Sequence, residues 1–235
     1  MDDADRRLTR KTRRPAPEDQ PILLDQHRTY KVLRALSVPA YKFLWGLQVE
    51  GAHRVPVDGP VIIAANHRSN FDSAVLPRIT HRPVNFMAKS EFFATPGLSR
   101  FLGHIGAFPV DRGRPDKAAT AHALAVLRAG GVLAVYPEGT RCTGREIGPV
   151  QRGPVWLAQR ADAQILPVGI GGSEFTQVKG SKRIHRMRIR IVVGDPLPPP
   201  VSRSREALAS RSTEVVKAIG ELFLEAGGPG PIPFR

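Results

Sequence analysis

The sequence predicts a single α/β domain in which helices flank a mainly parallel central sheet. Short apolar runs of strand length alternate along the chain with longer segments of helical periodicity, and turn residues separate the two kinds of segment. The chain has 235 residues, of which 41% are hydrophobic. That length and composition suffice for the core of one large α/β domain.

Each expected element follows from a local pattern. Strands are expected at 49–55, 61–65, 84–88, 107–110, 132–136, 165–170 and 187–193. Helices are expected at 71–79, 98–105, 116–129, 153–162 and 202–225. The alternation in the last strand indicates a half-exposed strand with a basic outer face. Asp116 is the expected cap of one helix and Ser202 or Ser204 that of the last.

The N-terminal fifty residues differ from the rest of the chain. Segment 1–20 mixes both charges with prolines and is expected to be a disordered tail. Segment 21–50 predicts a pair of amphipathic helices, because Pro39 should kink or divide it. Basic residues with Tyr and Trp are typical of a membrane-facing segment, although such helices could also simply cover the sheet. We expect the α/β domain at 51–226 and a flexible tail at 227–235.

The composition narrows the classes of partner. A net charge of +14 and a pI near 10.9 favour anionic partners such as lipid headgroups, phosphorylated ligands or nucleic acid. No signature of a DNA-reading fold occurs, so we expect no specific nucleic acid. The single cysteine, Cys142, excludes an intramolecular disulfide framework and a cysteine-cluster metal site. We expect neither a secretory signal nor a membrane span, since no apolar run approaches ~20 residues.

The most informative stretch is Asn-His-Arg-Ser-Asn-Phe-Asp at 66–72, directly after the apolar run 61–65. On one continuous helix, residues five apart lie roughly 140° from each other. His67 and Asp72 therefore meet only if His67 lies in the turn and Asp72 in the first helical turn. Asp72 would then orient the imidazole as a general base. The alternative is a capping box, with Ser69 as N-cap and His67 an ordinary turn residue.

Charged residues also follow three other predicted strands. They are Lys89, Glu91, Asp111, Arg112, Glu138 and Arg141. Because the carboxyl ends of parallel strands share one edge of a sheet, these side chains are expected near His67. Lys and Arg suit a phosphate, and Gly139 would let the backbone approach a ligand. Solvated strand ends, a simple turn and a Glu138–Arg141 pair on a loop are the plainer explanations.

Taken in order, four segments resemble the motifs of the glycerolipid acyltransferases, the lysophosphatidic acid acyltransferase family. The first is His67-x4-Asp72, and the second is Ile-Gly-Ala-Phe-Pro-Val-Asp-Arg at 105–112. The third is Tyr-Pro-Glu-Gly-Thr-Arg at 136–141, and the fourth is Ile-Leu-Pro-Val-Gly-Ile at 165–170. The resemblance covers about residues 44–195. The chain departs from the family pattern at Phe92 and Pro109, which leaves the identity of the acceptor open.

The resemblance implies a role for each candidate. His67 would deprotonate a glycerol hydroxyl while Asp72 holds the correct tautomer, and the acyl donor would be a thioester of coenzyme A or acyl carrier protein. The implied substrate-binding residues are Lys89, Arg112, Glu138, Gly139, Thr140 and Arg141. Of these, the cations would bind the acceptor phosphate, and Glu138 and Gly139 would shape its pocket. No cofactor, no metal and no acyl-enzyme on Cys142 are implied.

The leading hypothesis is therefore an enzyme that acylates 1-acyl-sn-glycerol-3-phosphate to phosphatidic acid. It would work on an anionic membrane surface, at the cytoplasmic face of the cell membrane, as a peripheral or monotopic protein. Glycerol 3-phosphate or another lysolipid remains possible as acceptor. The rival hypotheses are a basic membrane- or nucleic-acid-binding module and a hydrolase, although the chain lacks the Gly-x-Ser-x-Gly elbow of many hydrolases.

Overall fold

A computed structural model describes residues 26–111, 115–144, 147–148, 151–176 and 183–229. Their centre is a seven-stranded sheet in the order β1-β7-β6-β2-β5-β3-β4. The strands are β1 Gln48–Glu50, β2 Val61–Ala65, β3 Val84–Lys89, β4 Ala107–Val110, β5 Val132–Val135, β6 Gln164–Gly171 and β7 Arg190–Val193. The five strands from β6 to β4 run parallel, whereas β7 is antiparallel to β6 and parallel to β1. The predicted α/β fold with a mainly parallel sheet is confirmed.

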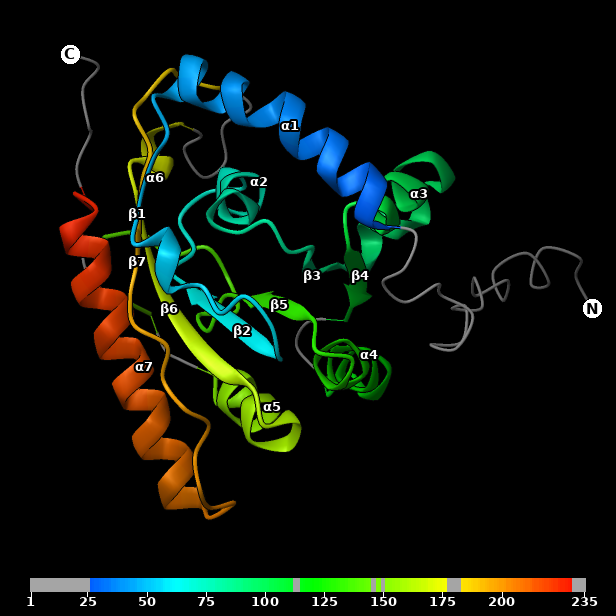
Figure 1. The fold of residues 1–235 in the computed structure, drawn as a ribbon, viewed down its shortest axis with the longest axis vertical. Coiled ribbons are helices and arrows are strands. Elements are labelled where there is room, and N and C mark those ends of the chain that lie inside the picture. The colour runs from blue at the N-terminus through cyan, green and yellow to red at the C-terminus, as the bar shows by residue number, and fades with distance from the viewer. Residues whose placement is uncertain (1–25, 112–114, 145–146, 149–150, 177–182, 230–235) are drawn as a thin grey trace, which may run out of the picture.

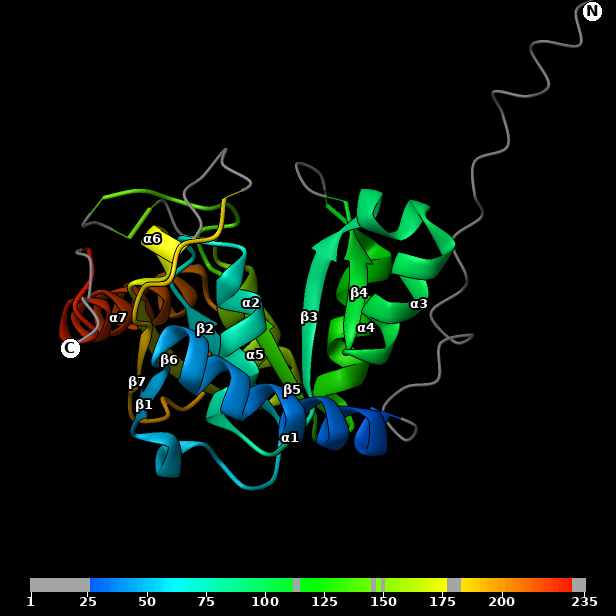
Figure 2. The ribbon, with the colours of Figure 1, turned by 90° about the horizontal axis from the view of Figure 1, so that it is seen from above.

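Helices cover both faces of the sheet (Figure 1, Figure 2). The α-helices are α1 Gln26–Trp45, α2 Phe71–Val75, α3 Pro96–His104, α4 Lys117–Arg128, α5 Gly153–Ala161, α6 Ser173–Thr176 and α7 Arg205–Glu225. The 3₁₀ turns are η2 Ala52–Arg54, η3 Leu76–Ile79 and η4 Ser90–Ala94. α1 and α2 pack on one face, and α4, α5 and α7 pack on the other. The result is a three-layer molecule with a hydrophobic core on each side of the sheet.

The central strand β2 shows why this layering forms. All five of its residues are buried, and successive side chains point to opposite faces of the sheet. Val61 and Ile63 belong to the core beneath α2, while Ile62 and Ala64 belong to the core beneath α4 and α5. A strand that is apolar on both faces needs cover on both, and the flanking helices provide it.

Several local predictions are confirmed. The strands at 61–65 and 107–110 begin and end as expected. Asp116 caps α4 by accepting a hydrogen bond from the Ala119 amide, and Ser204 caps α7 by accepting one from the Ala207 amide. These caps satisfy amide groups that the first helical turn leaves without partners.

The predicted pair of N-terminal helices is wrong, because α1 is one helix that continues through Pro39. Proline removes the hydrogen bond to the carbonyl four residues earlier, but both Pro39 and Ala35 are exposed, so water can reach that carbonyl. Contacts at both ends also hold the helix in place. Tyr30 donates a hydrogen bond to the Pro77 carbonyl, and Arg186 donates hydrogen bonds to the carbonyls of two residues in the last turn.

Two strand predictions also need correction. The first strand covers only Gln48–Glu50, because Gly51 adopts a left-handed φ of 71° and η2 follows. The last strand is not half exposed, because Ile191, Val192 and Val193 are all buried between the core under α1 and the contacting helix α7. The boundaries proposed for the whole chain stay predictions, and segments 1–20 and 230–235 lie outside the described residues.

Candidate active site

The carboxyl end of β2 delivers His67 to a fixed place. Asn66, the residue before it, is fully buried, and its side-chain amide forms two hydrogen bonds with the backbone of Ile170 in β6. These bonds, of 2.9 and 2.7 Å, extend the pairing of β2 with β6 by one residue. The chain therefore leaves the sheet at a defined point, and His67 is the first residue beyond it.

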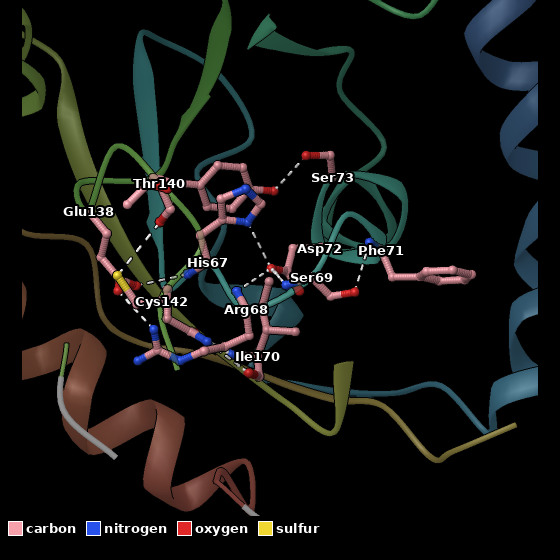
Figure 3. A network of polar contacts seen from close by, with 12 residues as sticks. His67, Arg68, Ser69, Phe71, Asp72, Ser73, Glu138, Thr140, Cys142 and Ile170 are labelled. Atoms are coloured by element: carbon pink, nitrogen blue, oxygen red, sulfur yellow. Dashed lines mark hydrogen bonds and ion pairs between the residues drawn. The ribbon is translucent and has the colours of Figure 1, made fainter. Parts of the chain in front are cut away.

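His67 and Asp72 are in direct contact (Figure 3). The Nδ1 atom of His67 lies 2.9 Å from Oδ2 of Asp72, with the imidazole in the turn and the carboxylate in the first turn of α2. The same oxygen accepts hydrogen bonds from the amides of Arg68 and Ser69, at 2.7 and 2.8 Å. Asp72 therefore orients the imidazole and also closes the helix start in the manner of a capping box. Nε2 is the ring nitrogen that does not contact Asp72.

Tyr136 forms a flat wall against this imidazole. Its ring stacks on the His67 ring with centroids 4.0 Å apart and an interplanar angle of 12°. Its hydroxyl lies 3.0 Å from the Ser73 hydroxyl on α2. Burial, with the nearby Asp72 charge, raises the pKa of Tyr136 well above its ordinary value, although the Ser73 contact opposes this. Tyr136 therefore stays neutral and restricts the orientation of the histidine ring.

A buried ion pair lies behind the histidine. Arg68 and Glu138 are joined at 2.8 Å, with side chains only 1% and 0% exposed. The other carboxylate oxygen of Glu138 accepts the His67 amide at 2.9 Å. The Arg68 guanidinium lies 4.9 Å from the centroid of the Phe223 ring on α7. The pair thus connects the turn after β2 with the loop after β5 and with the C-terminal helix.

Cys142 contributes its backbone to the site. Its amide donates a 2.9 Å hydrogen bond to the His67 carbonyl. Burial raises the pKa of the Cys142 thiol, and the Glu138 carboxylate raises it further. Because the thiolate is the nucleophilic form of cysteine, this environment does not favour an acyl-enzyme at this residue.

A cavity of about 380 Å³ opens beside His67, on the side of the sheet covered by α4 and α5. Most of its wall is apolar or aromatic, formed by Met87, Val110, Ala119, Ala134, Val135, Tyr136, Trp156 and Leu157. Polar groups from Asp111, Asp116, Thr120 and Gln151 also line it. Its volume falls within the range of small-molecule sites, and its walls suit an apolar chain with a polar end.

The structure brings some of the predicted residues together and separates others. Gly139 lines the cavity and has a left-handed φ of 65°, a backbone conformation that favours glycine. Thr140 is exposed, and Lys89 forms a surface ion pair with Glu91 at 2.7 Å. Arg141 is half-buried, and Arg112 lies outside the described residues. Neither Lys89 nor Arg141 is among the described residues that line the cavity, so the phosphate site stays a prediction.

Sequence reasoning missed three contributors: the Arg68 side chain, the Tyr136 ring and the Asn66 amide. All three lie inside segments that the motif resemblance already singled out. The signal for Arg68 is a charged residue in a turn that directly follows a fully apolar strand. The plainer Glu138–Arg141 pairing is replaced by the contact of Glu138 with Arg68.

The chain is similar in sequence to known proteins. Residues 46–171 match the family model described as Acyltransferase. The 1-acyl-sn-glycerol-3-phosphate acyltransferase of Bacillus subtilis (strain 168) is 29% identical over 153 residues, covering 65% of this chain and 74% of that protein. A probable 1-acyl-sn-glycerol-3-phosphate acyltransferase of Mycoplasma pneumoniae is 30% identical over 182 residues, covering 74% of this chain and 65% of that protein, just under two thirds of its length.

A solved structure is similar as well. The crystal structure of the 1-acyl-sn-glycerophosphate (LPA) acyltransferase PlsC from Thermotoga maritima aligns with a TM-score of 0.72 and 25% identity, covering 86% of this chain and 81% of that one. The family model spans more than half of the 235 residues and includes His67, Asp72 and Glu138. The chain therefore belongs to the acyltransferase family.

Proposed function

We propose that this acyltransferase moves a fatty acyl group from a thioester to the free hydroxyl of 1-acyl-sn-glycerol-3-phosphate, giving phosphatidic acid. The observation that carries the chemistry is the contact between His67 and buried Asp72 beside an apolar cavity. The acceptor is proposed from the names of the similar proteins, which act on that lysolipid. Glycerol 3-phosphate and other lysolipids are the alternative acceptors.

In the proposed reaction, Nε2 of His67 takes the proton of the acceptor hydroxyl as its oxygen attacks the thioester carbonyl carbon. A C–O bond forms, the C–S bond then breaks, and the leaving thiolate receives the proton from the imidazolium. The Asp72 carboxylate stabilises the imidazolium while it exists, because a hydrogen bond between two charged groups is stronger than one between neutral groups. No covalent acyl-enzyme forms in this scheme.

The cavity is the proposed binding site of the acyl group. Its apolar wall lies beside the His67 ring, so an acyl chain placed there would bring its carbonyl carbon to the base. Lys89, Arg112 and Arg141 remain the proposed ligands of the acceptor phosphate, and Gly139 and Thr140 lie on the loop that borders the cavity. Coenzyme A and acyl carrier protein are both proposed as carriers of the acyl group. The scheme uses no metal or other cofactor.

A membrane-facing surface would give access to lipid substrates. Val32, Leu36 and Phe43 share one face of α1, since they are spaced by four and seven residues, and all three are mostly exposed. α1 contacts α3, where Leu98 and Phe101 are also exposed. Exposed basic residues accompany both helices, namely Lys31, Lys42 and Arg100. None of the described helices has the length and apolar run needed to cross a bilayer.

We propose that this face of α1 and α3, joined by exposed Phe92 of η4, lies on an anionic membrane. Apolar side chains flanked by basic residues are the pattern of a protein that binds at the lipid headgroup level. The cytoplasmic leaflet is the proposed location, because its anionic lipids match a chain with a net charge of +14.

The proposed reaction is tested with H67A and an acceptor panel. Purified protein is incubated with labelled acyl-CoA or acyl carrier protein thioester and with 1-acyl-glycerol 3-phosphate, glycerol 3-phosphate or a neutral lysolipid, and products are identified by mass. H67A is expected to lose about 10²-fold to 10⁴-fold in kcat, while H53A, which alters an exposed histidine, keeps wild-type turnover. Near-normal turnover by H67A would exclude the base assignment, and hydrolysis without transfer would exclude the reaction.

The membrane surface is tested by sedimentation with phosphatidylglycerol-containing vesicles. The F43E and F101E variants are expected to weaken vesicle binding at least tenfold, because each places a negative charge where an apolar ring would enter the lipid. L224E places the same charge at another exposed apolar side chain, on α7, and is expected to bind like wild type. If F43E and F101E bind the vesicles as tightly as wild type and L224E do, another surface faces the lipid.

A further inference from the structure

The ion pair between Arg68 and Glu138 has no part in the proton transfer, yet it lies directly behind the proposed dyad. Its side chains are almost fully buried, and neither is among the described residues that line the cavity. Two charges removed from water are costly unless hydrogen bonds satisfy them. Such a pair is more readily explained by what it holds in place than by contact with a substrate.

Glu138 holds the main chain of His67. One carboxylate oxygen accepts the His67 amide at 2.9 Å, and the other accepts the Arg68 guanidinium at 2.8 Å and the Gly148 amide at 3.1 Å. A Cβ at Gly148 would lie 3.3 Å from this carboxylate and 2.7 Å from the Cys142 sulfur, so the loop fits closely around it. The His67 backbone is thereby fixed from one side while Asp72 fixes the ring from another.

Arg68 also contacts the dyad through its own main chain. Its amide donates a 2.7 Å hydrogen bond to the Asp72 oxygen that contacts the imidazole. Its guanidinium lies between Glu138 and the Phe223 ring. A shift of the Arg68 side chain would therefore move both the carboxylate that holds the His67 backbone and the peptide that holds Asp72.

We propose that the Arg68–Glu138 pair is the positioning element of the dyad, and that neither residue binds substrate. The pair keeps Nδ1 of His67 on Asp72 and the ring nitrogen opposite it toward the cavity. For Glu138 this replaces the pocket-shaping role that the motif resemblance implies. The inference rests on the proposed role of His67 as the base.

The E138Q variant tests this at nearly constant shape. Among the described residues, three N–H donors converge on the two oxygens of Glu138, whereas a glutamine offers one oxygen and one NH₂ group. The less costly orientation turns the oxygen toward Arg68 and Gly148, so the NH₂ group faces the His67 amide and its hydrogen bond is lost. Because small misplacements of a base can cost about 10²-fold, we expect kcat to fall about tenfold to a hundredfold with the KM of both substrates unchanged.

The R68M/E138Q double variant supplies a rescue. Without the guanidinium, the N–H donors left among the described residues are the His67 amide on one side and the Gly148 amide on the other, so the glutamine oxygen can return to the His67 amide. We expect a kcat at least threefold above that of E138Q but still below wild type. E50Q is the matched control, since Glu50 forms an exposed ion pair with Arg190 at 2.7 Å on the far strand of the sheet, and its kcat should be unchanged.

Proton NMR reads the geometry without any turnover. The low-field resonance of the proton between His67 and Asp72, assigned by its absence in H67A, should persist in wild type and E50Q and broaden or vanish in E138Q. A raised acceptor KM at unchanged kcat, or an unaltered resonance with wild-type kcat in E138Q, would overturn the proposal. If circular dichroism shows that E138Q is unfolded, the kcat of R68M/E138Q is measured instead. A wild-type kcat in that double variant would refute the positioning role.

These outcomes are distinct from failure of the proposed reaction. Acyl transfer by wild type and its loss in H67A establish the reaction independently of Glu138. If no acceptor is acylated, the reaction is wrong, but the resonance in E138Q still reports whether the ion pair fixes the contact between His67 and Asp72.

Discussion

Replacement of Asp72 by asparagine should reduce turnover only moderately, for a reason specific to this site. The Asp72 oxygen Oδ2 accepts three hydrogen bonds, from the His67 ring and from the amides of Arg68 and Ser69. The other oxygen, Oδ1, is buried and has no hydrogen-bond partner among the described residues. An asparagine amide can therefore place its oxygen at the Oδ2 position and keep all three bonds.

The two amide orientations differ strongly in free energy. With the NH₂ group at the Oδ2 position, two buried backbone amides lose their acceptor, at about 1–3 kcal/mol each. With the NH₂ group at the Oδ1 position, only that group lacks a partner. The second orientation leaves one buried group without a partner, whereas the first leaves two, so the second has the lower free energy. In that orientation the asparagine oxygen faces the imidazole, and His67 keeps a proton on Nδ1 and the correct tautomer.

The remaining loss in D72N is that of the carboxylate charge. A hydrogen bond to a charged group contributes about 1.5–3 kcal/mol and a neutral one about 0.5–1.5 kcal/mol. The difference of about 1–2 kcal/mol corresponds to a kcat lowered about fivefold to thirtyfold. D72A removes the acceptor for all three donors and should lose about as much kcat as H67A, about 10²-fold to 10⁴-fold.

The assay is steady-state acyl transfer at saturating donor and acceptor, with the folded fraction of each variant checked by circular dichroism. A folded D72N variant as inactive as H67A would refute this prediction, since it would mean that the amide turns its NH₂ group to the imidazole. A D72N variant with the wild-type rate would refute it as well, because Asp72 would then contribute no charge to the reaction.

Two further predictions concern stability. Burial raises the pKa of Glu174 above the usual 4.5, so between the unfolded and the folded pKa the folded state holds a proton that the unfolded chain has released. Stability should therefore fall as pH rises from the unfolded pKa to the folded pKa. The E174Q variant should lose this fall in melting temperature, while E221Q on the exposed face of α7 should keep it. In β6, an alanine Cβ at Gly169 would lie 2.2 Å from the Leu222 backbone of α7, so G169A should cost at least about 1–3 kcal/mol in the free energy of unfolding. G103A, which meets no atom within 4 Å, should be neutral or slightly stabilising by chemical denaturation.

Several local elements of the fold are predictable from the sequence. The strand at 61–65 depends only on an apolar run between two turns. The cap at Asp116 depends only on a carboxylate that accepts a hydrogen bond from the amide three residues later. The meeting of His67 with Asp72 was likewise predictable, since it requires only a turn followed by a helix start. Their catalytic role stays a prediction.

The contacts that the sequence could not reveal join distant segments. Arg68 and Glu138 are seventy residues apart, and their pairing requires β2 to lie beside β5, an order that periodicity does not specify. The stacking of Tyr136 on His67 depends on the same neighbouring strands. The undivided α1 depends on contacts from Arg186, far along the chain, which outweigh the local effect of Pro39.

The position of Phe223 has a consequence for recombinant work. The family model ends at residue 171, but the aromatic ring that covers the Arg68 guanidinium belongs to α7, more than fifty residues later. A fragment trimmed to the family boundary would expose a charged pair that the full chain keeps dry, and water would compete for its hydrogen bonds. Such a trimmed fragment should be poorly active even if soluble, so the last helix belongs in any expression design.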